Sequence, residues 1–420
     1  MRVVRYFLFV SFLTLLCAST GFCVDFFKMG KVDIHGFVSQ GALGSSDNNF
    51  FADTDENGTF QFNEVGLNFT TQVNDRLRVG AQILARDLGT MGNKEMTIDW
   101  AFADYAIRDW LNLKVGKVKL SYGLYNTSRD VDMLRTYVFL PQSVYNEGWR
   151  DTINALSGAS LYGFIPVGPL GNLTYYIQGG VADMDADNGA ARMLQDQPPP
   201  MLNVNIISVN MDYTHAANFI WEPFDGTKIG GGFWGLGFAA PSSYLNMPDP
   251  PPGPPVMTFG DFDLKMKSYV GFAECALGDL TLTAEYMESE YEMTLNGSPH
   301  MDGYKLKAEG YYGAFRYRAS SWFEVGGYYS EYYPNKEDKE GETATFYEKD
   351  FEYWLKDSCV ALRFDINEHW IVKLEGHYMD GAAIMFRSDD NMGVNEMSGM
   401  PESLFEQYWE LYALKFSFNF

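Results

Sequence analysis

The links between the strand-like segments of this chain alternate between tight and long, and this alternation restricts the fold more than any other sequence feature. From Val32 onward, segments of roughly ten residues alternate apolar and polar side chains, which is the pattern of β-strands. Every second link is short: Asn74–Asp75, Asp109–Trp110, Gly168–Asn172, Asp225–Gly226, Gly278–Asp279, Ser320–Ser321 and Asn367–Glu368. The intervening links are long and polar: residues 44–59, 88–95, 121–156, 183–212, 241–261, 294–303, 334–349 and 381–406.

Seven short turns and eight long loops imply sixteen strands, with both ends of the chain on the short-turn side. A soluble β-sandwich also alternates apolar and polar residues, but it has no reason to segregate its loops by length. A sheet that crosses a membrane must pair every backbone amide, so it closes into a barrel with short turns on one side. The sequence therefore predicts an all-β fold, a 16-stranded antiparallel transmembrane β-barrel formed by residues 24–420.

The last segment of the chain and its tryptophans favour the same fold. In Tyr408–Phe420, one face carries Tyr412, Leu414, Phe416, Phe418 and Phe420. Bacterial outer-membrane barrels characteristically end in such a strand with a C-terminal aromatic residue. Aromatic girdles at the headgroup level are also expected of a barrel. Eight tryptophans on predicted strands or at their ends are assigned to these girdles: Trp100, Trp110, Trp221, Trp234, Trp322, Trp354, Trp370 and Trp409.

The N-terminus predicts export. Arg2 and Arg5 precede the apolar stretch Tyr6–Cys17, and small residues follow at Ala18–Gly21, so residues 1–23 are predicted to be a signal peptide. After cleavage only Cys275 and Cys359 would remain. They could be free or form a single bridge in an oxidising compartment.

Composition excludes some classes of function. The net charge of −24 argues against a nucleic-acid partner, because phosphate binding needs basic surfaces. The five histidines are scattered, and neither a G-x-S-x-G nor an H-E-x-x-H motif is found in the sequence. We therefore expect no enzymatic activity and no cofactor.

One loop matches the spacing of a calcium-binding motif. Asp53, Asp55, Asn57 and Gly58, followed by Glu64, satisfy D-x-D-x-N-G-x5-E. An EF-hand needs flanking helices, whereas the residues after Gly58 have a strand pattern. A looser calcium site formed by Asp53, Asp55 and Asn57 in the first long loop is one interpretation. A polar loop followed by a strand is the other.

The stretch Leu113–Asp151, LKVGKVKLSYGLYNTSRDVDMLRTYVFLPQSVYNEGWRD, resembles a family of bacterial outer-membrane porins related to the dicarboxylate- and phosphate-selective porins. A weaker similarity extends through Phe60–Gly89. The resemblance implies a trimeric, sixteen-stranded diffusion pore whose third loop, here residues 121–156, folds into the lumen and narrows it. Unlike the phosphate-selective pores, this chain is acidic, so phosphate selectivity does not follow.

Selectivity in a pore comes from charges at close quarters, which identifies candidate residues. The constriction candidates are Arg129, Asp130, Asp132 and Arg135 in the third long loop, together with Lys117 and Lys119, which directly precede this loop. The wall candidates, assigned to the inner face by their positions in the alternation, are Arg76, Arg78, Arg86, Lys305, Lys307, Arg363, Lys373, Glu285, Glu375 and Asp365. If acidic side chains lie on one side of the pore and basic side chains on the other, they would place a transverse electric field across a permeating solute.

These patterns together predict a porin in the outer membrane of a Gram-negative bacterium. It would pass small hydrophilic solutes and ions by diffusion, organic anions among them. Lipopolysaccharide or other outer-membrane lipid and two further copies of the chain, in a homotrimer, are the expected partners. The alternative is a structural or adhesive barrel whose lumen is closed by loops.

Overall fold

The chain forms one closed antiparallel sheet. The computed structural model describes residues 31–420 except 55–56, 93–94, 187–188, 197–204, 247–255, 297–301, 345–347, 387–391 and 395–400. The predicted signal peptide, residues 1–23, lies outside the described residues. Sixteen barrel strands occur in the described part: β1 (Val32–Ser45), β2 (Phe62–Asn74), β3 (Leu77–Leu88), β4 (Met96–Arg108), β5 (Leu111–Lys119), β6 (Ala155–Pro166), β7 (Asn172–Ala182), β9 (Asn210–Glu222), β10 (Thr227–Asn246), β11 (Val256–Leu277), β12 (Leu280–Leu295), β13 (Tyr304–Ser320), β14 (Phe323–Tyr333), β15 (Leu355–Asp365), β16 (Trp370–Gly381) and β19 (Tyr408–Asn419).

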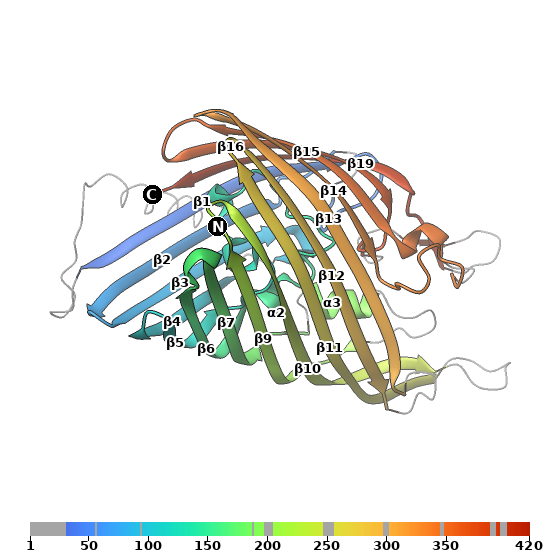
Figure 1. The fold of residues 1–420 in the computed structure, drawn as a ribbon. Coiled ribbons are helices and arrows are strands. Elements are labelled where there is room, and N and C mark those ends of the chain that lie inside the picture. Colours follow the sequence, from blue (N-terminus) through green and yellow to red (C-terminus); the bar gives the residue numbers. More distant parts are fainter. Residues whose placement is uncertain are drawn as a thin grey trace, which may run out of the picture.

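The first and last strands close the barrel. Strand β1 pairs with β2 on one side and with β19 on the other, and Gly36 and Phe420 exchange two backbone hydrogen bonds of 3.1 Å. The short turns lie at one end of the barrel and the long loops at the other (Figure 1). The predicted 16-stranded barrel, with its order of tight and long links, is confirmed.

The strands are unequal in length. Strands β10 and β11 have 20 and 22 residues, whereas β5 has 9. The predicted loop 241–261 is therefore too long, since β10 continues to Asn246 and β11 begins at Val256. Pro241 and Asp261, which are unusual in strands, face each other in this extension of the sheet.

The outer face of the barrel is apolar and aromatic, as a membrane requires. Trp110, Trp221, Trp322 and Trp370 are exposed and lie near the short turns. A second set of exposed tyrosines lies farther along the strands, toward the long loops: Tyr269, Tyr286, Tyr329, Tyr378 and Tyr412. On β19, Tyr412, Phe416 and Phe420 are exposed, whereas Lys415 and Ser417 are buried on the inner face, as predicted.

Three of the tryptophans assigned to the girdles face inward instead: Trp100, Trp234 and Trp409. Trp100 pairs with the inward-facing Gln82 and stacks on Phe102. Trp234 and Trp409 are buried, and Trp234 contacts Tyr122 and Trp149 with ring centroids 6.3 and 6.5 Å apart. The assignment was wrong because the lumen side of β10 is itself apolar, with Leu236 following Trp234 on the inner face. The inward-facing residues of one wall therefore form a hydrophobic core with the chain that lies inside the barrel.

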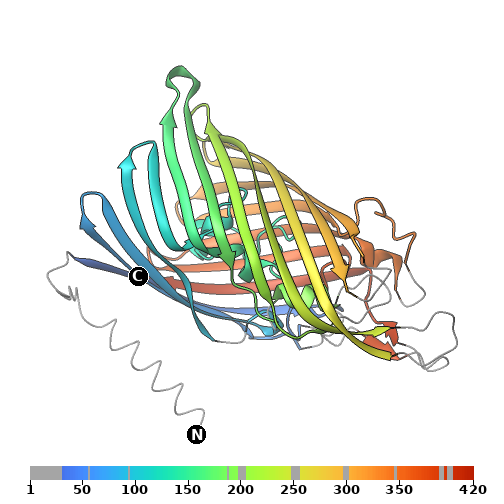
Figure 2. The same ribbon diagram turned by 90° about the horizontal axis from the view of Figure 1, so that it is seen from below.

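The remaining elements are short. They are α2 (Arg150–Asn154), α3 (Gly189–Asp196), β8 (Asn205–Ile206), β17 (Met392–Val394), β18 (Pro401–Ser403) and the 3-10 helices η1 (Gly89–Met91), η2 (Asn126–Ser128), η3 (Asp132–Leu134), η4 (Gly168–Leu170) and η5 (Asp350–Tyr353). None of the described helices is long and apolar enough to cross a membrane. The chain between β5 and β6 lies within the ring of strands in two perpendicular views (Figures 1 and 2).

Candidate functional site

Residues 120–154, which we call the inner segment, connect β5 to β6 and contact the opposite wall of the barrel. The Tyr122 and Ser268 hydroxyl oxygens are 2.9 Å apart. The Tyr125 hydroxyl donates a hydrogen bond of 2.6 Å to the Glu274 carboxylate. Ser268 and Glu274 both belong to β11, so the inner segment crosses the lumen.

A second contact ties the inner segment to β16. The backbone N–H groups of Val138 and Phe139 donate to the two carboxylate oxygens of Glu375, at 2.6 and 3.0 Å. The Tyr137 hydroxyl donates to the carbonyl oxygen of Phe315 on β13 at 2.6 Å. The segment is therefore attached to several strands rather than suspended from its ends.

The Glu147 carboxylate joins three guanidinium groups. It lies 2.9 Å from Arg129, 2.7 Å from Arg86 and 3.6 Å from Arg150, and all four side chains are buried. Burial alone would raise the pKa of Glu147, but the three arginines outweigh it and hold this pKa well below its usual value. The cluster links the inner segment to β3 through Arg86.

Asp132 forms a second buried cluster beside η3. Its carboxylate lies 2.9 Å from the Lys373 ammonium and 3.3 Å from that of Lys415, and it accepts a 2.6 Å hydrogen bond from Ser417. Arg135 lies 3.6 Å away. Burial opposes ionisation, but the pKa of Asp132 is lowered overall because the two lysines and Arg135 stabilise the carboxylate.

Asp130 belongs to a third group, next to the start of β6. It pairs with Lys119 and accepts a hydrogen bond of 2.9 Å from Gln82. Lys119 is also 3.3 Å from Asp99, which accepts a hydrogen bond from Asn154. Asp130 is thus connected to β3, β4 and β5 together.

The predicted constriction residues divide into two sets. Arg129, Asp130, Asp132 and Arg135 all lie on the inner segment, and Lys119, which is half-buried, pairs with the buried Asp130. Lys117 is separate, because it pairs with Asp183 at the rim of the barrel. What the structure brings together is therefore a set of attachments between the inner segment and the wall.

Most of the predicted wall residues face the lumen: Arg78, Arg86, Arg363, Lys373, Glu285, Glu375 and Asp365. Their charges have close partners. Arg78 lies 3.1 Å from Asp104, and Arg363 lies 2.8 Å from Asp365. Glu285 accepts a 2.6 Å hydrogen bond from the Tyr312 hydroxyl.

Three wall assignments are wrong. Tyr312 contacts Glu285 inside the barrel, so the odd-numbered residues near it on β13, including Lys305 and Lys307, face outward. Lys305 is accordingly exposed and lies 3.7 Å from Glu292 on the outside of β12. The inward assignment failed because it took the polar face of the alternation to be the lumen face, whereas the outer face of this wall is also charged, with Lys305 opposite Glu292 and Lys307 opposite Glu290. Arg76 lies in the exposed turn between β2 and β3 and not in the wall.

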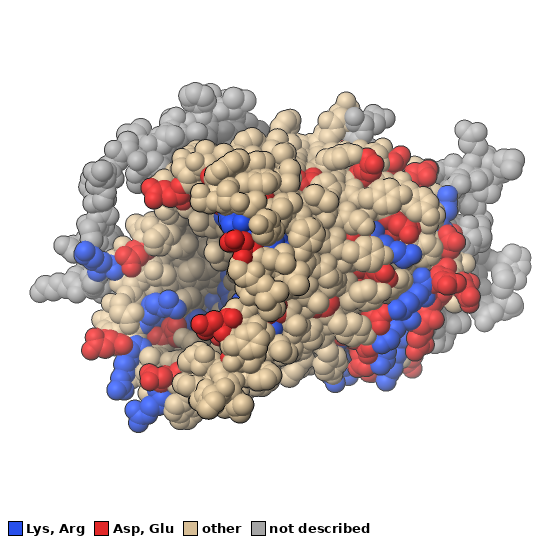
Figure 3. Space-filling model, turned by 45° about the horizontal axis from the view of Figure 1, so that its top comes forward, with Lys and Arg blue, Asp and Glu red and all other residues tan. Residues whose placement is uncertain are grey.

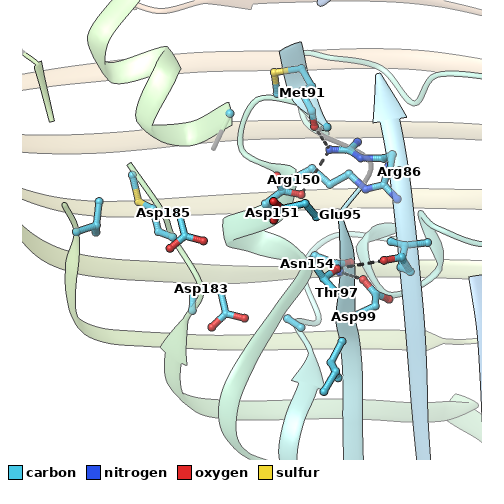
Figure 4. A pocket seen from close by; sticks show the side chains of 18 of the residues that line it. Arg86, Met91, Glu95, Thr97, Asp99, Arg150, Asp151, Asn154, Asp183 and Asp185 are labelled. Carbon is cyan, nitrogen blue, oxygen red and sulfur yellow. Dashed lines mark hydrogen bonds and ion pairs between the residues drawn. The ribbon is translucent and has the colours of Figure 1, made fainter. Parts of the chain in front are cut away.

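A cavity of about 1660 Å³ opens at the long-loop end, where β4 begins and β7 ends, beside α2 and α3. Its charged lining includes Arg86, Asp99, Lys117, Arg150, Asp183 and Asp185. Figure 4 shows Asp183 and Asp185 on one side of this cavity, with Arg86, Arg150 and Asp99 on the other. A solute that entered here would meet fixed charges of both signs.

The calcium motif is disrupted by the barrel. Glu64, its predicted closing ligand, faces the lumen and pairs with Arg150 at 2.9 Å and Lys415 at 2.8 Å. Asp55 lies outside the described residues, and Asp53 and Asn57 belong to the loop between β1 and β2. The second interpretation, a polar loop followed by a strand, accounts for Glu64. A calcium site formed by Asp53, Asp55 and Asn57 in the loop stays a prediction.

No known family model matches the chain, and no curated protein sequence matches it significantly. Solved structures do match its fold. OmpF of Salmonella typhi, in complex with daunomycin, aligns over 93% of this chain and 98% of its own, with 14% identity and a TM-score of 0.53. The outer membrane channel DcaP of Acinetobacter baumannii aligns over 95% and 100%, with 12% identity and a TM-score of 0.51. An anion-selective porin from Comamonas acidovorans aligns over 93% and 99%, with 9% identity and a TM-score of 0.50.

Identities this low establish the fold and nothing finer. The fold is that of the outer-membrane porins, and a barrel of this kind belongs in an outer membrane.

Sequence reasoning missed several members of the inner clusters: Glu64, Asp99, Glu147, Arg150 and Lys415. Glu64 and Lys415 could have been found, since each occupies an inward position in the alternation of its own strand. Glu147 and Arg150 could not, because no period-two pattern governs the inner segment.

Proposed function

We propose that this chain is a porin that passes small hydrophilic solutes and ions by passive diffusion, organic anions among them. The observation that carries the proposal is the inner segment, which crosses the lumen and is tied to β11 and β16. A segment fixed in this way narrows a passage to a defined size. The paired charges beside it would keep the passage polar.

The test is single-channel recording from the purified, folded protein in planar bilayers. Stepwise conductance supports the porin. A tightly folded barrel that gives no steps would overturn the proposal and favour the alternative, a structural or adhesive barrel with a closed lumen. That alternative has one observation in its favour, the apolar contact of Tyr122 and Trp149 with Trp234, which fills part of the lumen.

Ion preference can be tested with two matched substitutions. Lys117 is on the outer side of β5, as Val115 is, but it lines the cavity at the long-loop end, whereas Lys305 is not among the residues that line this cavity. Lys117→Gln should shift the reversal potential in a salt gradient toward cation preference, because it removes a positive charge from the solute path. Lys305→Gln should leave the reversal potential unchanged. Equal shifts in both variants would show that the cavity is not on the path.

We also propose that the barrel forms a homotrimer, as the family resemblance implies. The outer face supports this, because Val38 and Ala42 on β1 and Val65 on β2 are small or aliphatic where other strands carry tyrosine. A protein neighbour needs no aromatic girdle there. The mass of the detergent-solubilised protein before and after heating tests the assembly.

Lipopolysaccharide is the lipid partner that we propose. Charged side chains of both signs interleave on the outer surface at the long-loop end (Figure 3). Among them, Lys307 lies 2.7 Å from Glu290, and Lys305 lies 3.7 Å from Glu292. They would face the charged headgroups of the outer leaflet. Comparing retention of lipopolysaccharide by the unaltered protein and by a Lys305→Gln/Lys307→Gln variant tests this partner.

A further inference from the structure

A buried group of polar side chains lies under the inner segment, where Glu375 of this group fixes the segment to β16. Among the described residues, Cys359, Glu375 and His377 form the one group of potential metal ligands whose donor atoms all lie within 4.8 Å of one another. Cys359 belongs to β15, and the other two belong to β16. All three side chains face the lumen side and are buried.

The imidazole of His377 lies between two carboxylates. Its Nδ1 is 3.0 Å from Asp357 and its Nε2 is 3.0 Å from Glu375. A neutral imidazole carries one N–H, so it can donate to only one of these carboxylates. The other contact requires either a second proton or a cation between the nitrogen and the carboxylate.

Among the described side chains, the two carboxylates share a single basic partner, His377, whereas other acidic groups in the lumen have several. In the described part of the chain, no lysine or arginine forms an ion pair with Asp357 or Glu375. This contrasts with Glu147 and Asp132, which each contact at least two basic side chains. Buried charges in proteins are either paired or coordinate a metal ion.

We propose that Cys359, Glu375 and His377 bind a divalent cation of the zinc type beneath the inner segment. A thiol, an imidazole and a carboxylate are the ligand types that zinc prefers, and three protein ligands leave the fourth position for water. On binding, the thiol of Cys359 and the Nε2 of His377 each release their proton to solvent. The cation then replaces the hydrogen bond between His377 and Glu375.

The surroundings hold these ligands in the orientation that metal binding needs. Asp357 faces the Nδ1 of His377 and itself accepts a 3.0 Å hydrogen bond from the Tyr328 hydroxyl. A carboxylate on the second imidazole nitrogen is the usual outer partner of a metal-bound histidine. Glu375 is fixed by the N–H groups of Val138 and Phe139, so the cation would link the wall to the inner segment.

The chain provides its own matched control, because its two described cysteines are both free and lie on different strands. The experiment titrates the purified, folded barrel with Co²⁺ and then displaces it with Zn²⁺. We expect one equivalent of Co²⁺ to produce a thiolate-to-metal charge-transfer band. Cys359→Ser should abolish this band, and Cys275→Ser should retain it. No band in the unaltered protein, or a band lost with Cys275, would overturn the proposal.

Two further measurements guard against a variant that fails to fold. In Cys275→Ser, the remaining thiol of Cys359 should be protected from alkylation by excess Zn²⁺, and lack of protection contradicts the site. Asp357→Asn should keep the Co²⁺ band but weaken Zn²⁺ binding by about 10–100-fold, as expected for an outer partner. An Asp357→Asn protein with unchanged affinity would exclude the positioning role that we assign to Asp357.

Discussion

The lumen and the outer face of β12 and β13 carry the same kinds of charged residue in opposite surroundings. Inside, the Glu147 side chain is 8% exposed and contacts three arginines. Outside, Glu292 is 47% exposed and lies 3.7 Å from Lys305, which is 75% exposed. An exposed ion can exchange its partner for water, whereas a buried ion cannot. The burial of an ion pair, and not the signs of its charges, therefore determines how much the pair contributes to the stability of the barrel.

The largest effect that we predict comes from Glu147→Gln. It leaves Arg86, Arg129 and Arg150 without their shared carboxylate in the buried cluster, and breaking a buried pair in this way costs about 3–5 kcal/mol. We expect the free energy of unfolding in denaturant to fall by that amount. Channel conductance should become noisier, because the inner segment loses the Glu147–Arg86 pair, one of its attachments to β3.

The matched control for this prediction is Glu292→Gln, the same substitution on the outer face. It should leave both the unfolding transition and the conductance close to those of the unaltered protein. Equal destabilisation by the two variants would contradict the distinction between the lumen and the outer face.

Lys415→Met should have an intermediate effect. Lys415 contacts Glu64 at 2.8 Å and Asp132 at 3.3 Å, but Glu64 keeps Arg150 and Asp132 keeps Lys373. The loss in unfolding free energy should therefore be smaller, about 1–3 kcal/mol. The lumen also gains one net negative charge, so the reversal potential should shift toward cations. A stable Lys415→Met barrel with unchanged selectivity would show that this cluster lies off the solute path.

The comparison also predicts a pH dependence. The pKa of Glu147 is held below its usual value, so its contribution to stability is complete above the pKa of the unfolded chain, about 4. That contribution is lost only as the pH falls through the lowered pKa of the folded state. The difference in unfolding midpoint between the unaltered protein and Glu147→Gln should thus stay constant from pH 7 to about pH 4. A difference that shrinks between pH 6 and 5 would contradict the strong pairing.

The barrel could be predicted from the sequence because the patterns that indicate it involve residues that are close together in the sequence. Alternation along each strand and the order of tight and long links depend on neighbouring residues, and turns such as Asp225–Gly226 fix the strand count. Errors arose where local signals conflicted with the sheet. Pro241 resembled a loop residue but lies within β10, and Trp234 resembled a girdle residue but faces the lumen.

The contacts of the site could not be predicted in the same way. Lys373 and Asp132 are far apart in the sequence, and their contact depends on how the inner segment folds across the lumen. The alternation also fails to separate the two faces of β13, because Lys305 and Lys307 lie where the outer wall carries charge. The alternation shows that the two faces of a strand differ. It does not show which face is the lumen face, and this is established only by a contact with a neighbouring strand, such as that of Tyr312 with Glu285.

The smallest predicted effect concerns the outer pair of Lys305 and Glu292, and it depends on salt. Exposed pairs contribute about 0.2–1 kcal/mol, so Lys305→Gln should lower the unfolding free energy by no more than this at low ionic strength. At about 1 M salt the screening length falls to about 3 Å, and the effect should disappear. Lys415→Met should keep its effect at the same salt concentration, because ions do not reach the buried cluster. If salt reduced both effects equally, the lumen cluster would be as accessible to solvent as the outer face, and its pairs could not hold the inner segment in place.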